Sequence, residues 1–278
     1  MNKPESLSTL SRGLTYISAV FYFLVGLTMF LAPAWTSANF AWKVSPFVAM
    51  TIGAWCIGNA TMAYESARIW QWAITHPTLV YLWSFAIAET GVLILFWDKV
   101  VLNSPIAWAY AFTLIIAVLT AFVGIVETMI RRPAVTSIGA PIESWVRAGM
   151  VFFMIVVGTL ALGGLQAQQG GLSTEAVIFP ETLTLFTVRA FAVFFGSLVI
   201  AGIPLIRSKG IAPLYFTARA AIMLIIPILY AAFANLDKFD FTARPLGLGY
   251  FVAYIGTLIF TLIVLQRYRN SSPSSASA

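Results

Sequence analysis

The sequence predicts an all-α integral membrane protein whose eight transmembrane helices form two parallel four-helix repeats, related by a pseudo-twofold axis along the membrane normal. Three observations predict this fold class: the composition, the number of long apolar segments, and the recurrence of scarce charged residues at a fixed spacing. Hydrophobic residues make up 60% of the 278 residues and charged residues 9%, and the mean hydropathy is +0.90. Soluble proteins carry about 25% charged residues, so these charges are too few to cover a soluble domain. We therefore expect the chain to lie in a lipid bilayer.

Eight apolar segments approach the roughly 20 residues that a helix needs to cross the hydrocarbon core of a bilayer. Prolines mark most of their ends, as is typical of helix termini. Only Pro204 and Pro227 fall inside segments, and Pro227, near the middle of the seventh, is expected to kink its helix. The flanking prolines are Pro46, Pro77, Pro105, Pro213 and Pro245 at the starts, and Pro33 and Pro133 at the ends. The predicted spans are 13–32, 47–64, 77–97, 105–130, 145–165, 184–206, 213–234 and 246–266.

The first segment has some features of a cleaved signal peptide. Lys3 and Arg12 precede it, and it ends in Ala32-Pro33-Ala34. Its apolar stretch, from Leu14 to Leu31, is longer than the 7–15 residues of a usual signal-peptide core. We therefore expect it to remain in the protein as the first transmembrane helix.

An even number of spans places both chain termini on the same side of the membrane. Of the 16 Lys and Arg residues, eleven lie on that side, four lie on the other, and Arg189 lies within a span. Because basic loops are retained in the cytoplasm, we expect both termini to be cytoplasmic. The general style of the chain resembles bacterial polytopic membrane proteins, so the expected location is the bacterial plasma membrane.

Charged residues recur at a shift of 139 residues. This shift places Arg68 on Arg207 and the pair Asp98-Lys99 on the pair Asp237-Lys238, each at the same end of a corresponding span. Coincident charges are rare in a chain with so few of them, so they indicate a duplicated four-helix unit. Because four is even, both units have the same orientation, and the expected symmetry axis runs along the membrane normal.

The repeat defines the predicted domain organisation. The first repeat spans 1–132, a polar cytoplasmic linker spans 133–144, and the second repeat spans 145–270. The last segment, 271–278, consists of small and polar residues and is expected to be a disordered tail. Small residues four apart, Ala49 with Gly53 and Ala54 with Gly58, are expected to let helix backbones approach closely.

Two charged residues inside the apolar spans are the candidates for a functional site. Glu89 lies near the midpoint of the third span, and Arg189 lies about a turn and a half into the sixth. With a rise of about 1.5 Å per residue, we place them about 3 Å and about 9 Å from the midplane toward the outer side. A charge inside a bilayer needs a partner or an aqueous cavity, so we expect the two to pair. The 139-residue shift turns Glu89 into Ile228 and Arg189 into Met50, so each charge occurs in one repeat only.

Two interpretations of this polar site remain open. It is either a centre that binds an ion, a proton or an anionic ligand, or a structural ion pair that locks two helices together. In a variant of the structural interpretation, the Arg189 side chain extends outward to the lipid headgroups.

The remaining charged and special residues have simpler interpretations. His76 is either a titrating gate or an interfacial residue at a helix start, and Pro227 is a candidate flexible point. The paired outer charges are expected to stop helices and anchor them at the interface, or else to line a vestibule. These paired charges are Asp98, Lys99, Asp237 and Lys238.

Composition also excludes several kinds of site. Cys56 is the only cysteine and His76 the only histidine, so disulfides, cysteine clusters, His-rich metal sites and a haem with two histidine ligands are excluded. With one central acid and no central histidine, the pairs of groups that an intramembrane hydrolase needs are absent. We therefore predict no catalytic residues, no metal and no cofactor, and an enzyme is the least favoured class. The basic charge follows from loop asymmetry, so no nucleic-acid partner is expected.

Two functions from different classes remain. The first is a small-solute or ion transporter, or a ligand-binding membrane protein, with Glu89 and Arg189 at its centre. The alternative is a structural or accessory subunit of a larger membrane complex, or a lipid-binding protein without transport. The expected partners are the lipid bilayer and either another membrane protein or further copies of the chain.

Overall fold

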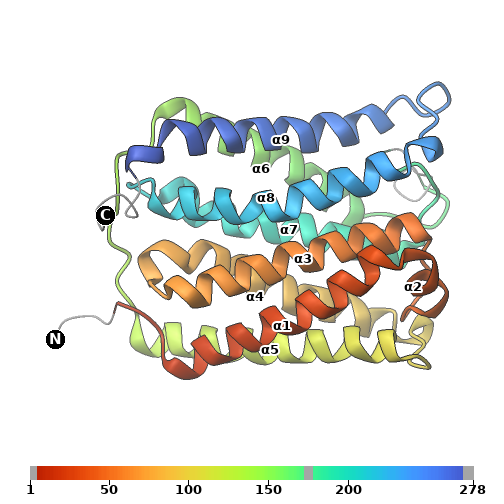
Figure 1. Ribbon diagram of the computed structural model, residues 1–278, viewed down its shortest axis with the longest axis horizontal. Helices are drawn as coiled ribbons and strands as arrows, with labels where there is room; N and C mark the ends of the chain where they lie inside the picture. The colour runs from red at the N-terminus through yellow and green to blue at the C-terminus, as the bar shows by residue number, and fades with distance from the viewer. Residues whose placement is uncertain (1–4, 172–177, 272–278) are drawn as a thin grey trace.

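The computed structural model describes residues 5–171 and 178–271, and within these ranges the fold is all α (Figure 1). The α-helices are α1 (Thr9–Leu31), α2 (Pro33–Asn39), α3 (Pro46–Ile69), α4 (Trp72–Leu95), α5 (Pro105–Arg131), α6 (Ser144–Leu165), α7 (Leu185–Arg207), α8 (Ala212–Ala234) and α9 (Gly247–Arg267). Three short 3-10 helices accompany them: η1 (Trp97–Lys99), η2 (Leu236–Lys238) and η3 (Arg269–Ser271). The predicted tail and Lys3 fall outside the described residues, except for Ser271.

The eight predicted spans are confirmed as helices. Eight of the helices are long and apolar enough to cross a membrane, whereas α2 has seven residues. The protein is therefore a multi-pass membrane protein by the length and composition of its helices. The end of the bundle at which α1 and α6 begin and α9 ends, on the left of Figure 1, is named the terminal end, and the opposite end the far end.

The start of α4 differs from the prediction. Pro77 was expected to begin the helix, but α4 begins at Trp72, so Pro77 lies inside it. A proline lacks only its own backbone N–H, and here the turn before it forms without that donor. Gln71 O accepts from the backbone N–H groups of Ile74 and Thr75, and the His76 ring, through Nδ1, hydrogen-bonds to Trp72 O at 2.9 Å.

The helices lie in four layers, visible from bottom to top in Figure 1 as α1 with α5, α3 with α4, α7 with α8, and α6 with α9. The two inner layers meet where α3 packs on α8 and α4 packs on α7. Helix α3 is the most enclosed, with 83% of its most apolar window buried, compared with 22% for α6 and for α9. The core is therefore centred on α3, while α6 and α9 present most of their surface to the surroundings.

Close approach between helices depends on glycine. A Cβ atom at Gly53 of α3 would lie 2.7 Å from the Phe30 nitrogen and 2.9 Å from the Gly26 carbonyl oxygen, both in the backbone of α1. A Cβ at Gly58 would lie 2.7 Å from the Cβ of Leu224 on α8. The packing role predicted for Gly53 and Gly58 is confirmed, because no larger residue fits where these helices touch.

Replacing Gly53 with alanine is expected to destabilise the protein by about 1–3 kcal/mol, the usual cost of overpacking a core. The new methyl group meets backbone atoms of α1, which cannot rotate away, so the two helices must separate. The measurement is chemical or thermal unfolding of the purified protein in detergent.

The matched control is Gly91→Ala in α4, where an added Cβ meets nothing within 4 Å. This variant is expected to stay within about 0.5 kcal/mol of the wild type. Equal stabilities of the two variants would contradict the close α1–α3 contact.

Candidate functional site around Glu89

Glu89 lies in the core of the first four long helices. Its residue is 2% exposed, and six residues of α4 separate it from Leu95 at the far end of the helix. Because α4 begins earlier than predicted, Glu89 lies about 8 Å from the middle of its helix, farther toward the far end than the 3 Å expected. The carboxyl group is nevertheless enclosed, since α1, α3 and α5 surround this part of α4.

One oxygen of the Glu89 carboxyl group has a partner and the other does not. The Tyr110 hydroxyl on α5 donates a hydrogen bond of 2.9 Å to Oε1. Oε2 is buried and has no hydrogen-bond partner among the described residues. A buried carboxylate with an unpartnered oxygen is costly in a medium of low polarity, so this oxygen is where a proton or cation would bind.

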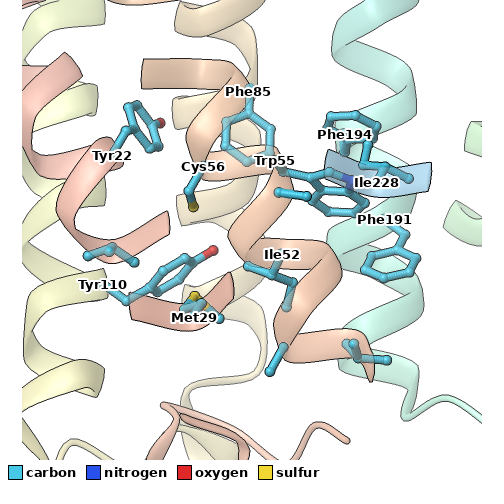
Figure 2. Packing of buried hydrophobic residues seen from close by; sticks show 14 of the residues in the cluster. Tyr22, Met29, Ile52, Trp55, Cys56, Phe85, Tyr110, Phe191, Phe194 and Ile228 are labelled. Carbon is cyan, nitrogen blue, oxygen red and sulfur yellow. The ribbon is translucent and has the colours of Figure 1, made fainter. Parts of the chain in front are cut away.

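Other polar groups of the first four long helices face the same region. The Tyr22 hydroxyl on α1 and the Cys56 thiol on α3 both interact electrostatically with Glu89. Figure 2 shows Tyr22, Cys56 and Tyr110 in one part of the core, beside the aromatic contact of Trp55 and Phe194. The site therefore takes one side chain from each of α1, α3, α4 and α5.

Arg189 does not join this site. Its Nη2 donates a hydrogen bond of 3.1 Å to the carbonyl oxygen of Ala167, in the connection that follows α6. Within residues 5–171 and 178–271, no ion pair links Arg189 to Glu89. The structure thus does not bring together the expected pair, because the long arginine side chain extends outward along α7 to a backbone carbonyl.

Metal binding by several acidic or sulfur ligands finds no support in the described part of the chain. No group of three His, Cys, Asp or Glu side chains there is close enough to hold a metal ion. A cation at Glu89 would be bound by one carboxylate together with hydroxyl groups. This arrangement fits a proton or a weakly held monovalent ion better than a divalent metal, which favours several carboxylates.

The other candidate residues lie apart from Glu89. His76 is buried at the start of α4, beside the Trp72 ring at 5.5 Å between centroids. Pro227 lies inside α8 in the second half. At the far end, the Lys99 ammonium forms an ion pair of 2.9 Å with Asp98 in η1 and holds the pKa of this exposed carboxyl below its usual value. Asp237 and Lys238 occupy the corresponding η2.

Two cavities lie near the bundle core, and Glu89 lines neither. One, of about 180 Å³, opens at the far end between Lys43, Ser45, Glu181 and Thr187. The other, of about 10 Å³, lies among α1, α3, α4 and α5, and Tyr22 lines it. Tyr22 therefore links the smaller cavity to the surroundings of Glu89.

Replacing Tyr110 with phenylalanine is expected to destabilise the protein by about 1–3 kcal/mol, the cost of leaving a buried acceptor without its donor. The measurement is unfolding of the purified protein in detergent. In a double-mutant cycle, the same change made in the Glu89→Gln background should cost less, because the strong acceptor is gone. Identical costs in both backgrounds would contradict the Glu89–Tyr110 hydrogen bond.

Comparison with known proteins adds no relative: no protein family, no curated protein and no solved structure matches this chain. Its function is therefore inferred from the residues around Glu89.

Proposed function

We propose that this multi-pass membrane protein binds a proton or a small monovalent cation at Glu89, and that it acts as an ion or small-solute transporter or as a ligand-binding membrane protein. The observation that carries the proposal is the unpartnered Oε2 of a carboxyl group that is 2% exposed. Ionisable groups inside transmembrane helices are costly and typically serve ion or proton pathways.

The absence of a cationic partner separates this site from a structural ion pair. In a structural pair both charges are compensated, whereas the described partner of Glu89 is the neutral Tyr110 hydroxyl. The carboxyl group is then neutralised by something that comes and goes with conditions, a proton or a cation. The proposed central Glu–Arg site is thereby narrowed to Glu89, with Arg189 an outward anchor of α7.

We also infer that the chain is a fused pseudo-dimer of two four-helix units. The Trp55 and Phe194 rings stack with centroids 4.0 Å apart and planes 3° apart, and the Thr78 and Thr217 hydroxyls lie 3.0 Å apart. Each pair is separated by 139 residues, the shift that relates the repeats. Two residues related by a twofold axis can touch each other only on that axis, so both contacts support this inference.

Equivalent contacts away from the axis give independent support. At the terminal end, Arg12 donates to the carbonyl oxygen of Ala67 at 2.7 Å, and Arg147 donates to that of Ile206. Ala67 and Ile206 are again 139 residues apart. At the far end, the two Asp-Lys pairs form the one-turn helices η1 and η2.

The sidedness of the protein is part of the same proposal. We place the terminal end in the cytoplasm of a bacterial cell, because eleven of the Lys and Arg residues belong to that side. The lipid bilayer is the surrounding partner, and the large apolar side chains exposed on the outer layers are consistent with contact with lipid tails.

One observation favours the alternative function, a structural or accessory subunit of a larger complex. Helices α6 and α9 are the least buried of the long helices, with 22% of their apolar windows covered. Another membrane protein or a further copy of the chain has room to pack on them. This function predicts that a partner copurifies in mild detergent and that Glu89 affects stability alone.

Replacing Glu89 with glutamine is expected to abolish ion flux or ligand affinity while the protein still folds. The measurement is proton flux into vesicles of phosphatidylcholine and phosphatidylglycerol that contain a pH-sensitive dye, driven by a potassium diffusion potential. The amide has nearly the same shape as the carboxyl group but cannot take up a proton or balance a cation.

The matched control for this test is Asp98→Asn, which removes an exposed carboxylate at the far end. Its flux should equal that of the wild type. Equal flux in wild-type, Glu89→Gln and protein-free vesicles would contradict transport and favour the accessory-subunit function.

A cysteine pair at Thr78 and Thr217 is expected to form an intramolecular disulfide under mild oxidation, since the two side chains meet at the inferred axis. The measurement is the loss of two free thiols at unchanged apparent mass, with each single cysteine variant as control. Free thiols that persist in the folded double variant would contradict the inferred axis.

A further inference from the structure

The buried face of α1 is polar along its first four turns. Ser8, Ser11, Thr15, Ser18 and Tyr22 follow one another at spacings of three and four residues, which places them on one side of a helix. Ser11, Thr15, Ser18 and Tyr22 are all buried. Hydroxyl groups along the enclosed face of a membrane helix are unusual, because apolar or small residues pack there at lower cost.

Helix α5 faces this row with polar groups of its own. At the terminal end, the Ser8 backbone N–H donates to Glu127 at 2.8 Å, and the Ser8 hydroxyl donates to the other oxygen of the same carboxylate. Deeper in the bundle, the Ser18 and Thr120 hydroxyls lie 2.8 Å apart. The two helices are thus joined by hydroxyl and carboxylate groups from the terminal surface inward.

The small cavity continues this row. Its volume of about 10 Å³ is near the smallest that holds one water molecule. Thr15, Ser18, Thr120, Tyr22 and Trp83 line it together with apolar side chains. The Tyr22 hydroxyl and the Trp83 indole N–H have no partner among the described residues. A water molecule in this cavity would give both of them a partner and would have the two to four polar contacts that buried water needs.

Tyr22 connects the cavity to the carboxyl group. Its side chain lines the cavity, and its hydroxyl interacts electrostatically with Glu89. From the other helices packed around Glu89, the titratable groups that face it are Cys56 on α3 and Tyr110 on α5. Arg189 on α7 is directed to Ala167, and among the described residues of α8 no titratable side chain interacts with the carboxyl group.

The second half lacks such a row. The buried positions of α6, the counterpart of α1, are Val146, Met150, Val157, Ala161 and Gly164. The polar face is therefore no requirement of the four-helix unit. It occurs in the half that contains Glu89.

We propose that the hydroxyl groups of α1 and α5, with one water molecule in the small cavity, form a proton path from the terminal end to Glu89. Glu127 collects the proton at the entrance. At each step an O–H bond breaks on one hydroxyl or water as a new one forms on its neighbour, and the last O–H bond forms at Oε2 of Glu89. The proton delivered neutralises the carboxylate, so charge and atoms balance. This inference rests on the proposed function, and it assigns the proton as the bound species and the terminal end as its source.

The test measures how fast Glu89 takes up a proton after a rapid drop in pH. The full chain is placed in lipid nanodiscs of phosphatidylcholine and phosphatidylglycerol, and the infrared C=O band of the protonated carboxyl group is followed in time. Glu89→Gln identifies the band by its disappearance. The path variant combines Ser18→Ala with Thr120→Val, and the matched control is Thr261→Val, which removes a buried hydroxyl from α9.

The expected result is a band of unchanged final size in the path variant that appears about tenfold or more slowly than in the wild type. The control should match the wild type. A path variant that protonates as fast as the wild type overturns the path while leaving Glu89 as the working group. A wild-type protein with no band that depends on Glu89 overturns proton binding, and with it this form of the proposed function.

A second variant covers the case in which the double variant does not fold. Thr15→Val changes one hydroxyl that lines the cavity and leaves the Ser18–Thr120 contact in place. Slower protonation in this variant supports the path, and an unchanged rate contradicts it.

Discussion

A lipid bilayer offers no hydrogen-bonding partner, and most of this structure follows from that constraint. The backbone answers it by forming long helices in which each N–H and C=O is satisfied internally. Side chains answer it less uniformly. Many buried Ser and Thr hydroxyls bond to a carbonyl one turn earlier, as Thr51 does to Phe47. Glu89 has no such local solution, so its environment is the clearest sign of a function beyond folding.

Helix contacts in this protein are set by shape rather than by apolar attraction, because lipid is as apolar as the helix surfaces. Gly53 and Gly26 bring α1 onto α3 at backbone distance. That contact holds the polar face of α1 against the core, where its hydroxyl groups meet those of α5. Close packing by small residues and the enclosure of polar side chains are thus linked: a wider separation would admit lipid or water between the helices.

The sequence predicted the spans well and the site in part. The spans were found because apolar length is a strong signal, and the error at α4 arose because Pro77 was taken as a helix start. Glu89 was found because charges are scarce. Its partner was wrongly predicted because Arg189 lies on a neighbouring helix at a similar depth, and the direction of a long side chain is not written in its spacing. Tyr110 and Tyr22 were missed because the chain contains ten tyrosines. The three-and-four spacing of Ser11, Thr15, Ser18 and Tyr22 was the available signal.

The position of Glu89 limits what the protein can carry. In transporters built from repeats, substrates bind at the interface between the repeats, which opens when the repeats rock against each other. Here the carboxyl group lies inside the first four-helix unit, away from the Trp55–Phe194 contact between the halves. Rocking of the halves would leave it enclosed, and opening the unit itself would have to break the close backbone contact between α1 and α3. A solute of any size needs such an opening. A proton does not, because it moves by exchange of O–H bonds through packed side chains and single water molecules, and the architecture therefore favours a proton over a larger solute.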